Sequence, residues 1–130
     1  MILLLVGASA AAYGQASTSS AELPLGTFQG TGKIAGGTHT IKIYSTLGSV
    51  MVFYTGATKC TAMMMSSDDP GVYEERDYYS GGGVSKDSCK EKGLIYLVSS
   101  SPTKMTYHWG ATAEEVMKKP MPVKLIRIKK

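Results

Sequence analysis

Short strand-forming segments separated by turn residues run through most of this chain. From residue 26 onward they alternate with Gly, Pro, Asp and Ser, at the spacing of about 8–12 residues that is typical of an antiparallel sandwich or barrel. No spacer is long enough for the helical crossover that parallel strands need, so a parallel sheet is excluded. Eight segments are predicted to be strands: residues 27–33, 38–44, 49–54, 60–66, 72–79, 94–98, 104–109 and 123–128.

The predicted strands differ in how they distribute apolar residues. Residues 49–54 and 94–98 are apolar on both faces, which indicates central, covered strands. Residues 72–79 carry charge on both faces, so we expect this strand at an edge or a rim of the sheet. Residues 104–109 alternate, with Met105, Tyr107 and Trp109 on one face.

One segment, residues 111–119, has helical character. Thr112 is a suitable N-cap, Glu115 completes a capping box, and Pro120 ends the helix. Apolar residues make up 43% of the 130 residues, which is enough for a core and excludes disorder of the middle of the chain. The predicted fold is all-β: a small antiparallel β-barrel of about eight strands with one short helix near the C-terminus.

The N-terminal residues have the pattern of a secretory signal peptide. An apolar run over residues 2–6 leads into small residues, with Ala-x-Ala-like sites up to Ala16, although no Lys or Arg precedes the run. We predict a signal peptide over residues 1–16, a flexible leader over 17–25 and a single β-barrel domain over 26–130. The alternative is that residues 1–16 form a buried helix or strand of the domain. No apolar run reaches the roughly 18 residues of a membrane span.

Export gives the two cysteines a specific meaning. Cys60 and Cys89 are the only cysteines in the chain, and an even pair in an oxidising compartment predicts a disulfide. Two buried free thiols are the alternative. The spacing lacks a Cys-x-x-Cys pair and does not indicate zinc. The predicted location is therefore periplasmic or extracellular.

Several short motifs resemble those of small exported bacterial β-barrel domains, which are lipocalin- or avidin-like. The motifs are Gly26-x-Phe28-x-Gly30, the segment 60–65, Tyr73-Glu74-Glu75, Cys89-x-x-x-Gly93-x-Ile95-x-Leu97 and Met105-x-Tyr107-x-Trp109. The resemblance covers about two thirds of the chain and departs from lipocalin-like barrels at Phe28, where they prefer Trp. It implies a closed antiparallel barrel with an internal disulfide, and it implies no catalytic residue.

Acidic residues form the most polar local cluster, made of Asp68, Asp69, Glu74, Glu75 and Asp77. We interpret it as a solvated edge partly paired with Arg76. The alternative is a hydrolase that uses Glu75 and Asp77, because paired carboxylates about 5–10 Å apart serve glycoside hydrolysis. His39 and His108 are interpreted as surface or rim residues, and the run Met63, Met64 and Met65 as core filling. Nucleophile-elbow, P-loop, dinucleotide and His-Glu-x-x-His motifs are absent.

Tyrosine and lysine provide the candidate contact surfaces. Tyr73, Tyr78, Tyr79 and Trp109 beside the Gly-rich loop 80–88 have the amphipathic rings that binding surfaces favour. Residues 118–130 carry six basic and no acidic side chains, which favours contact with anionic surfaces. Nucleic-acid binding is not predicted, because no basic–aromatic stripe is present.

The preferred hypothesis is an exported, non-enzymatic binding module for a protein partner or for a small apolar ligand in the barrel mouth. The first alternative is an inhibitor of a secreted hydrolase, such as a lysozyme or protease, with loop 80–88 as the inserting element. The second alternative is a carboxylate-dependent hydrolase. No metal or cofactor is predicted.

Overall fold

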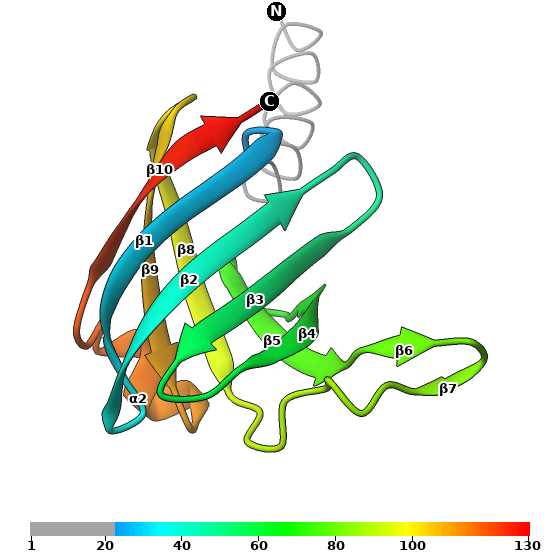
Figure 1. The fold of residues 1–130 in the computed structure, drawn as a ribbon. Coiled ribbons are helices and arrows are strands. Elements are labelled where there is room, and N and C mark those ends of the chain that lie inside the picture. The colour runs from blue at the N-terminus through cyan, green and yellow to red at the C-terminus, as the bar shows by residue number, and fades with distance from the viewer. Residues whose placement is uncertain (1–22) are drawn as a thin grey trace, which may run out of the picture.

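A computed structural model of the chain describes residues 23–130 as a closed antiparallel barrel of eight strands (Figure 1). The barrel strands are β1 (Gly26–Ile34), β2 (Gly37–Ser45), β3 (Val50–Gly56), β4 (Cys60–Ser66), β5 (Val72–Asp77), β8 (Leu94–Ser101), β9 (Lys104–Gly110) and β10 (Val123–Lys129). The predicted fold class is confirmed. The predicted signal peptide and most of the predicted leader lie outside the described residues.

The strands follow one another around the barrel in chain order. The order is β1-β10-β9-β8-β5-β4-β3-β2, so each barrel strand pairs with the next one in the sequence and β10 pairs with β1 to close the sheet. At Gly30 a Cβ atom would lie 2.1 Å from the Lys124 carbonyl oxygen, so only glycine allows β1 to approach β10 this closely.

The predicted edge position of residues 72–79 is wrong. A closed barrel has no edge, and β5 pairs with β4 on one side and with β8 on the other. The segment also divides, because β5 ends at Asp77 and Tyr79 begins β6 (Tyr79–Ser80). Charge on both faces of this segment therefore reflects one polar group inside the barrel rather than an exposed edge.

A short hairpin, here called the arm (residues 78–85), projects from the barrel beyond β5 (Figure 1). Strand β6 pairs with β7 (Gly83–Val84), and the turn between them has positive φ at Gly81 and Gly82, as a tight two-residue hairpin turn requires. Strands of two residues are too short to be stable alone, so the arm depends on how its base is attached.

The helix is shorter than predicted. Helix α2 spans Ala113–Met117, and Thr112 caps it by accepting a hydrogen bond from the Glu115 backbone N–H. The Glu115 carboxylate in turn accepts from the Ala111 N–H at 3.0 Å, so the capping box is confirmed with its return bond one residue earlier. No helix within residues 23–130 has the length and apolar character to cross a membrane.

Alternate residues of each strand fill the barrel interior. The largest fully buried side chains are Phe28, Ile41, Ile43, Val52, Ile95, Met105, Tyr107, Leu125 and Val116. All of these except Val116, which lies on α2, belong to one continuous core cluster. The centre of the barrel is therefore packed with side chains, and pockets lie at its ends and on its outer surface.

Candidate binding site at the barrel mouth

A cavity of about 410 Å³ opens at one end of the barrel, which lies within the range of about 300–1,000 Å³ for small-molecule sites. Its walls come from the β1–β2 hairpin, the β3–β4 turn and the loop that follows the arm. Ile34, His39, Tyr54, Glu75 and Trp109 are among the side chains that line it. We call this cavity the mouth.

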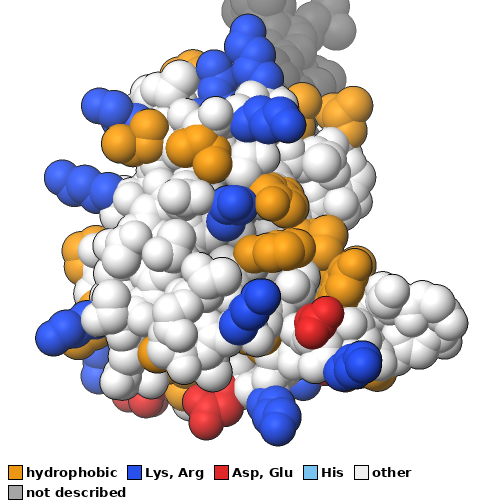
Figure 2. Space-filling view, viewed as in Figure 1, with side chains coloured by type: hydrophobic (Ala, Val, Ile, Leu, Met, Phe, Trp, Pro, Cys, Tyr) orange, Lys and Arg blue, Asp and Glu red, His pale blue; other side chains and the backbone are white. Residues whose placement is uncertain are grey.

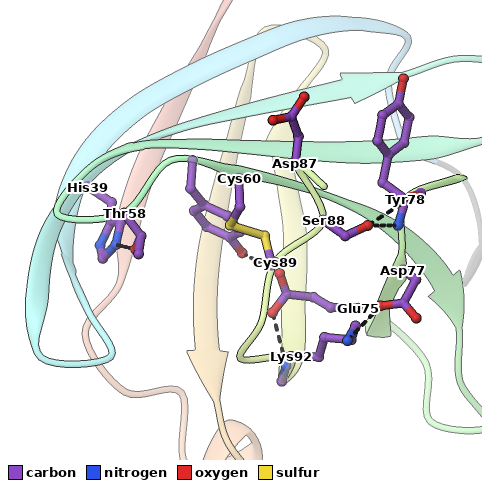
Figure 3. Close-up of a disulfide and its surroundings, with 12 residues drawn as sticks. His39, Thr58, Cys60, Glu75, Asp77, Tyr78, Asp87, Ser88, Cys89 and Lys92 are labelled. Atoms are coloured by element: carbon purple, nitrogen blue, oxygen red, sulfur yellow. Dashed lines mark hydrogen bonds and ion pairs between the residues drawn. A yellow bond between two sulfur atoms is a disulfide. The ribbon is translucent and has the colours of Figure 1, made fainter. Parts of the chain in front are cut away.

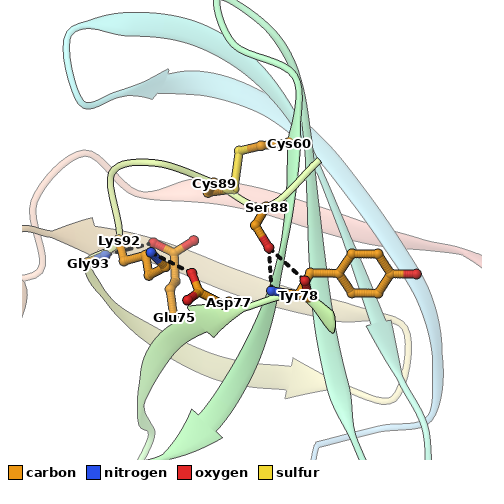
Figure 4. Close-up of polar contacts among 8 residues, drawn as sticks. All are labelled: Cys60, Glu75, Asp77, Tyr78, Ser88, Cys89, Lys92 and Gly93. Carbon is orange, nitrogen blue, oxygen red and sulfur yellow. Dashed lines mark hydrogen bonds and ion pairs between the residues drawn. A yellow bond between two sulfur atoms is a disulfide. The ribbon is translucent and has the colours of Figure 1, made fainter. Parts of the chain in front are cut away.

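Glu75 is the polar centre of the mouth. Its side chain is 4% exposed, and strand alternation places it inside the barrel beside the buried Tyr73. One carboxylate oxygen accepts a hydrogen bond from the Trp109 indole N–H at 2.8 Å. The same oxygen accepts from the Gly93 backbone N–H at 3.0 Å (Figure 4). The other oxygen accepts from the Tyr54 hydroxyl at 2.9 Å. Three donors from three separate segments therefore hold this carboxylate in one orientation.

The hydrogen-bond chain continues into the core. Because the Tyr54 hydroxyl donates its single proton to Glu75, the bond between Tyr54 and Tyr107 has Tyr107 as the donor. Burial raises the pKa of both phenols well above their ordinary value, and the Glu75 charge raises both further. Both tyrosines therefore remain neutral donors, and the chain Tyr107–Tyr54–Glu75 ends on the carboxylate.

Burial also governs the proton affinity of Glu75. Loss of solvation raises the pKa of this carboxyl, while the donors Trp109, Tyr54 and Gly93 and the nearby charge of Lys92 act in the opposite direction. The effect of burial is larger, so Glu75 retains its proton to a higher pH than an exposed glutamate does.

The two histidines are buried, so their interpretation as surface residues is wrong, whereas the rim position holds for His39 at the mouth. His39 lines the mouth at 5% exposure. Its Nδ1 lies 3.1 Å from the Gly37 carbonyl, which only accepts, so Nδ1 carries a proton, and its Nε2 lies 2.7 Å from the Thr58 hydroxyl (Figure 3). His108 lies on β9 and does not line the mouth. Its Nδ1 is 3.0 Å from the Pro120 carbonyl oxygen.

The predicted disulfide between Cys60 and Cys89 is confirmed, with Cα atoms 4.9 Å apart (Figure 3). It joins the first residue of β4 to the loop after the arm, and Cys89 is buried against the core. Next to it, Ser88 accepts from the Tyr78 N–H at 2.6 Å and donates to the Tyr78 carbonyl at 2.8 Å (Figure 4). These contacts fix the base of the arm to the rim of the mouth.

The acidic residues that were predicted to form one cluster lie in different places. Glu75 is inside the barrel, so its interpretation as part of a solvated edge is wrong. Its burial could have been inferred from the hydrophobic residue Tyr73, which shares its strand face and is also buried. Asp77 pairs with Lys92 at 2.6 Å outside the mouth, and Glu74 pairs with Arg76 at 2.9 Å. Asp68 and Asp69 lie in the exposed turn between β4 and β5.

The predicted aromatic contact surface is also divided. Tyr73 is buried in the core, Trp109 lies in the wall of the mouth, and Tyr78 stands at the base of the arm. Tyr79 is 57% exposed on the arm. Of the three methionines predicted to fill the core, Met64 is buried, whereas Met65 is 48% exposed because strand alternation turns it outward.

Four members of the site were not predicted from the sequence: Tyr54, Tyr107, Gly93 and Thr58. Tyr107 shares its strand face with Trp109, which was an available signal, but nothing in the sequence connects either residue to Glu75. Within residues 23–130, no group of His, Cys, Asp or Glu side chains has an arrangement that could hold a metal ion.

The fold and this site define a class of protein: a closed, disulfide-linked antiparallel barrel of eight strands with a filled interior and a polar mouth. No protein-family model, curated protein or solved structure matches the chain. The closed antiparallel barrel with an internal disulfide, which the resemblance implied, is confirmed. A relationship to lipocalin- or avidin-like families stays a prediction.

Proposed function

We propose that this chain is an exported, non-enzymatic binding module that takes a small ligand in the mouth of its barrel. The single observation that supports this function is the cavity of about 410 Å³ with the buried carboxylate of Glu75 in its wall. Small-molecule sites combine an apolar lining with a few well-placed polar groups. The disulfide is consistent with export to an oxidising compartment, periplasmic or extracellular.

The lining suggests the chemistry of the ligand. The rings of Tyr54 and Trp109 offer an apolar wall, and Glu75 between them accepts hydrogen bonds. Lys59 and Lys86 stand exposed at the rim. We expect a ring-bearing small molecule with a hydroxyl directed toward Glu75 and an anionic group directed toward the rim lysines.

A carboxylate-dependent hydrolase receives less support. The predicted partner carboxylate, Asp77, forms an ion pair with Lys92 and does not line the mouth. Both oxygens of Glu75 already accept hydrogen bonds from protein groups. Glu75 is therefore suited to accept a hydrogen bond from a bound ligand. A hydrolase of this kind would instead need two carboxylates on opposite sides of the scissile bond.

The binding prediction can be tested with 4-hydroxyphenylacetate, which carries a hydroxyl, a ring and a carboxylate. Trp109 is the only tryptophan of the chain, so its fluorescence reports occupancy of the mouth. We expect a saturable change in fluorescence with this probe. Ala57 is exposed and lines the mouth, so Ala57→Phe should fill the entrance and weaken binding at least about tenfold.

The matched control is Ala113→Phe, which adds the same ring to the exposed start of α2. This variant should bind as the wild-type chain does. If neither the probe nor a panel of related ring-bearing acids produces a saturable change, or if Ala57→Phe leaves binding intact, the mouth is not the binding site.

The arm favours a second candidate function, inhibition of a secreted hydrolase. Tyr79 and Val84 are a cross-strand pair on the arm, and both side chains are more than half exposed, at 57% and 55%. Exposed apolar side chains on a projecting hairpin whose base is held by Ser88, next to the disulfide, are suited to insertion into a groove of a partner. Such a held base reduces the ordering entropy that is lost on binding.

This second candidate predicts that the chain slows at least one enzyme in a panel of secreted lysozymes and proteases. The change Tyr79→Ser with Val84→Ser should weaken inhibition at least about tenfold, since aromatic anchors dominate interfaces. Val98→Ser, at a 40% exposed position on β8, is the control and should inhibit normally. Absence of inhibition at micromolar concentration would remove this function.

A further inference from the structure

One broad face of the barrel carries cations and no carboxylates. Residues 23–67 and 116–130 contain no Asp or Glu, and they supply five strands that are neighbours around the barrel, in the order β10-β1-β2-β3-β4. We call the outer surface of these strands the basic face. Its cations are Lys33, Lys42 and Lys124 on the strands and Lys129 and Lys130 at the end of β10. The carboxylates of the described residues lie on β5, in the loops around it and on α2.

Apolar side chains are interleaved with these cations. On the outside of the sheet, Met51 is the register partner of Tyr44 and of Met63, and Phe53 is the partner of Lys42. The rings of Tyr44 and Phe53 lie 5.0 Å apart. Figure 2 shows hydrophobic side chains beside Lys and Arg across the side of the molecule formed by β10, β1, β2 and β3. Apolar side chains of β2, β3 and β4 therefore lie next to the cations on the outside of the sheet.

A groove lies at the end of the basic face opposite the mouth, between the β2–β3 loop and the C-terminal residues. Its volume is about 690 Å³, and its lining combines Leu47 and Ile128 with Lys42, Lys129 and Lys130. Leu47 is 93% exposed and Ile128 is 55% exposed. The groove therefore offers apolar surface next to three ammonium groups.

We propose that the basic face docks on an anionic phospholipid bilayer, with lipid phosphates at the groove lysines and with Leu47 and Ile128 at the boundary of the acyl chains. Lysine near an anionic lipid surface and exposed apolar side chains contribute together to such binding. Tyr44 is suited to the headgroup level, where amphipathic rings accumulate. This proposal concerns a different surface from the mouth and stands independently of the proposed ligand site.

The charge of the basic face disfavours two other partners, a second copy of the chain and an acidic protein. Two copies related by a two-fold axis on this face would place its cations against one another without a carboxylate to compensate. An acidic protein is less suitable, because lysine is depleted in protein interfaces and arginine is the residue that pairs with carboxylates through two bonds. All five cations of this face are lysines.

The test is co-sedimentation of the full chain with vesicles of phosphatidylcholine, with and without phosphatidylglycerol. We expect binding only to vesicles that contain the anionic lipid, and a loss of binding at high salt. The change Lys42→Gln with Lys129→Gln should weaken partitioning about twenty-five-fold, since each lysine near an anionic surface contributes about fivefold. Leu47→Ser, at a fully accessible loop position, should weaken it as well.

The matched control is Lys118→Gln with Lys119→Gln, which removes the same charge near the end of α2, at the opposite end of the barrel from the C-terminal residues (Figure 1). This variant should partition like the wild-type chain. Equal losses in both double variants, or equal binding to neutral vesicles, would overturn the proposal. Binding to an acidic protein without binding to anionic vesicles would overturn it too. Binding of 4-hydroxyphenylacetate should be the same in both double variants.

Discussion

Replacing Glu75 with leucine is expected to lower the free energy of unfolding by about 3–5 kcal/mol. The change leaves the Trp109 indole, the Gly93 N–H and the Tyr54 hydroxyl without their acceptor, and each buried unsatisfied donor costs about 1–3 kcal/mol. Relief of the buried charge offsets part of this sum. Thermal unfolding followed by circular dichroism should show Tm lower by about 12 °C or more.

The neighbouring residue offers a matched control. Glu74 faces outward and pairs with the exposed Arg76, so Glu74→Leu should change the free energy of unfolding by no more than about 0.5 kcal/mol. Comparable losses for the two variants would show that the hydrogen bonds to Glu75 contribute little.

Glu75→Gln separates the charge from the hydrogen bonds. The amide oxygen still accepts from Trp109 and Gly93, but its NH₂ group donates to Tyr54, which then donates to Tyr107 and leaves the Tyr107 hydroxyl without an acceptor. We expect a loss of about 1–2 kcal/mol, smaller than for leucine.

The raised pKa of Glu75 also gives the wild-type chain a distinct pH dependence. Above the ordinary value of 4.5, the unfolded chain releases this proton while the native chain still holds it. The native state then binds more protons, so the contribution of Glu75 to stability is complete below pH 4.5 and is lost as the pH rises through the native pKa. Glu75→Gln lacks this group, so the stability of the wild-type chain relative to Glu75→Gln should fall over this interval. A relative stability that is flat or rises with pH would contradict the raised pKa.

The second large effect is expected from Cys60→Ser with Cys89→Ser. The disulfide joins residues 29 positions apart, and closure of a loop of this length stabilises the native state by about 3–4 kcal/mol in the chain-entropy account. Tm should fall by about 12 °C or more. The arm should also lose protection from hydrogen exchange, since the disulfide lies beside the Ser88 contacts that hold its base.

A reducing agent provides the control for this prediction. It should lower the Tm of the wild-type chain to that of the double variant and leave the double variant unchanged. If the double variant and the wild-type chain unfold at the same temperature, the disulfide does not contribute to stability as expected.

Much of the fold was predictable because it depends on local patterns. Alternation such as Ile41 and Ile43 identifies a strand and its inner face, and short turns with Gly, Pro and Asp require antiparallel neighbours. The edge assignment of residues 72–79 failed because alternation reports which side chains share a face but not what covers that face. Barrel closure through the pairing of β10 with β1 removed every edge.

The site was less predictable, because its members come from distant parts of the sequence. Tyr54 and Glu75 are 21 positions apart, and Trp109 lies 34 positions beyond Glu75. A carboxylate next to hydrophobic residues can face solvent or the interior, and the choice depends on whether donors are present inside. The sequence contains those donors, but only the closed barrel brings them within hydrogen-bond distance.

The sequence alone determined an antiparallel all-β fold of short strands, its capped helix and the identity of the only two cysteines, because periodicity, turn chemistry and residue counts act over short distances. Only the tertiary structure decided that Glu75 and both histidines are buried, that the acidic cluster divides, and that the cations share a face without carboxylates. Each of those outcomes depends on which strands become neighbours when the sheet closes, and pairing between distant strands is not encoded in any local pattern.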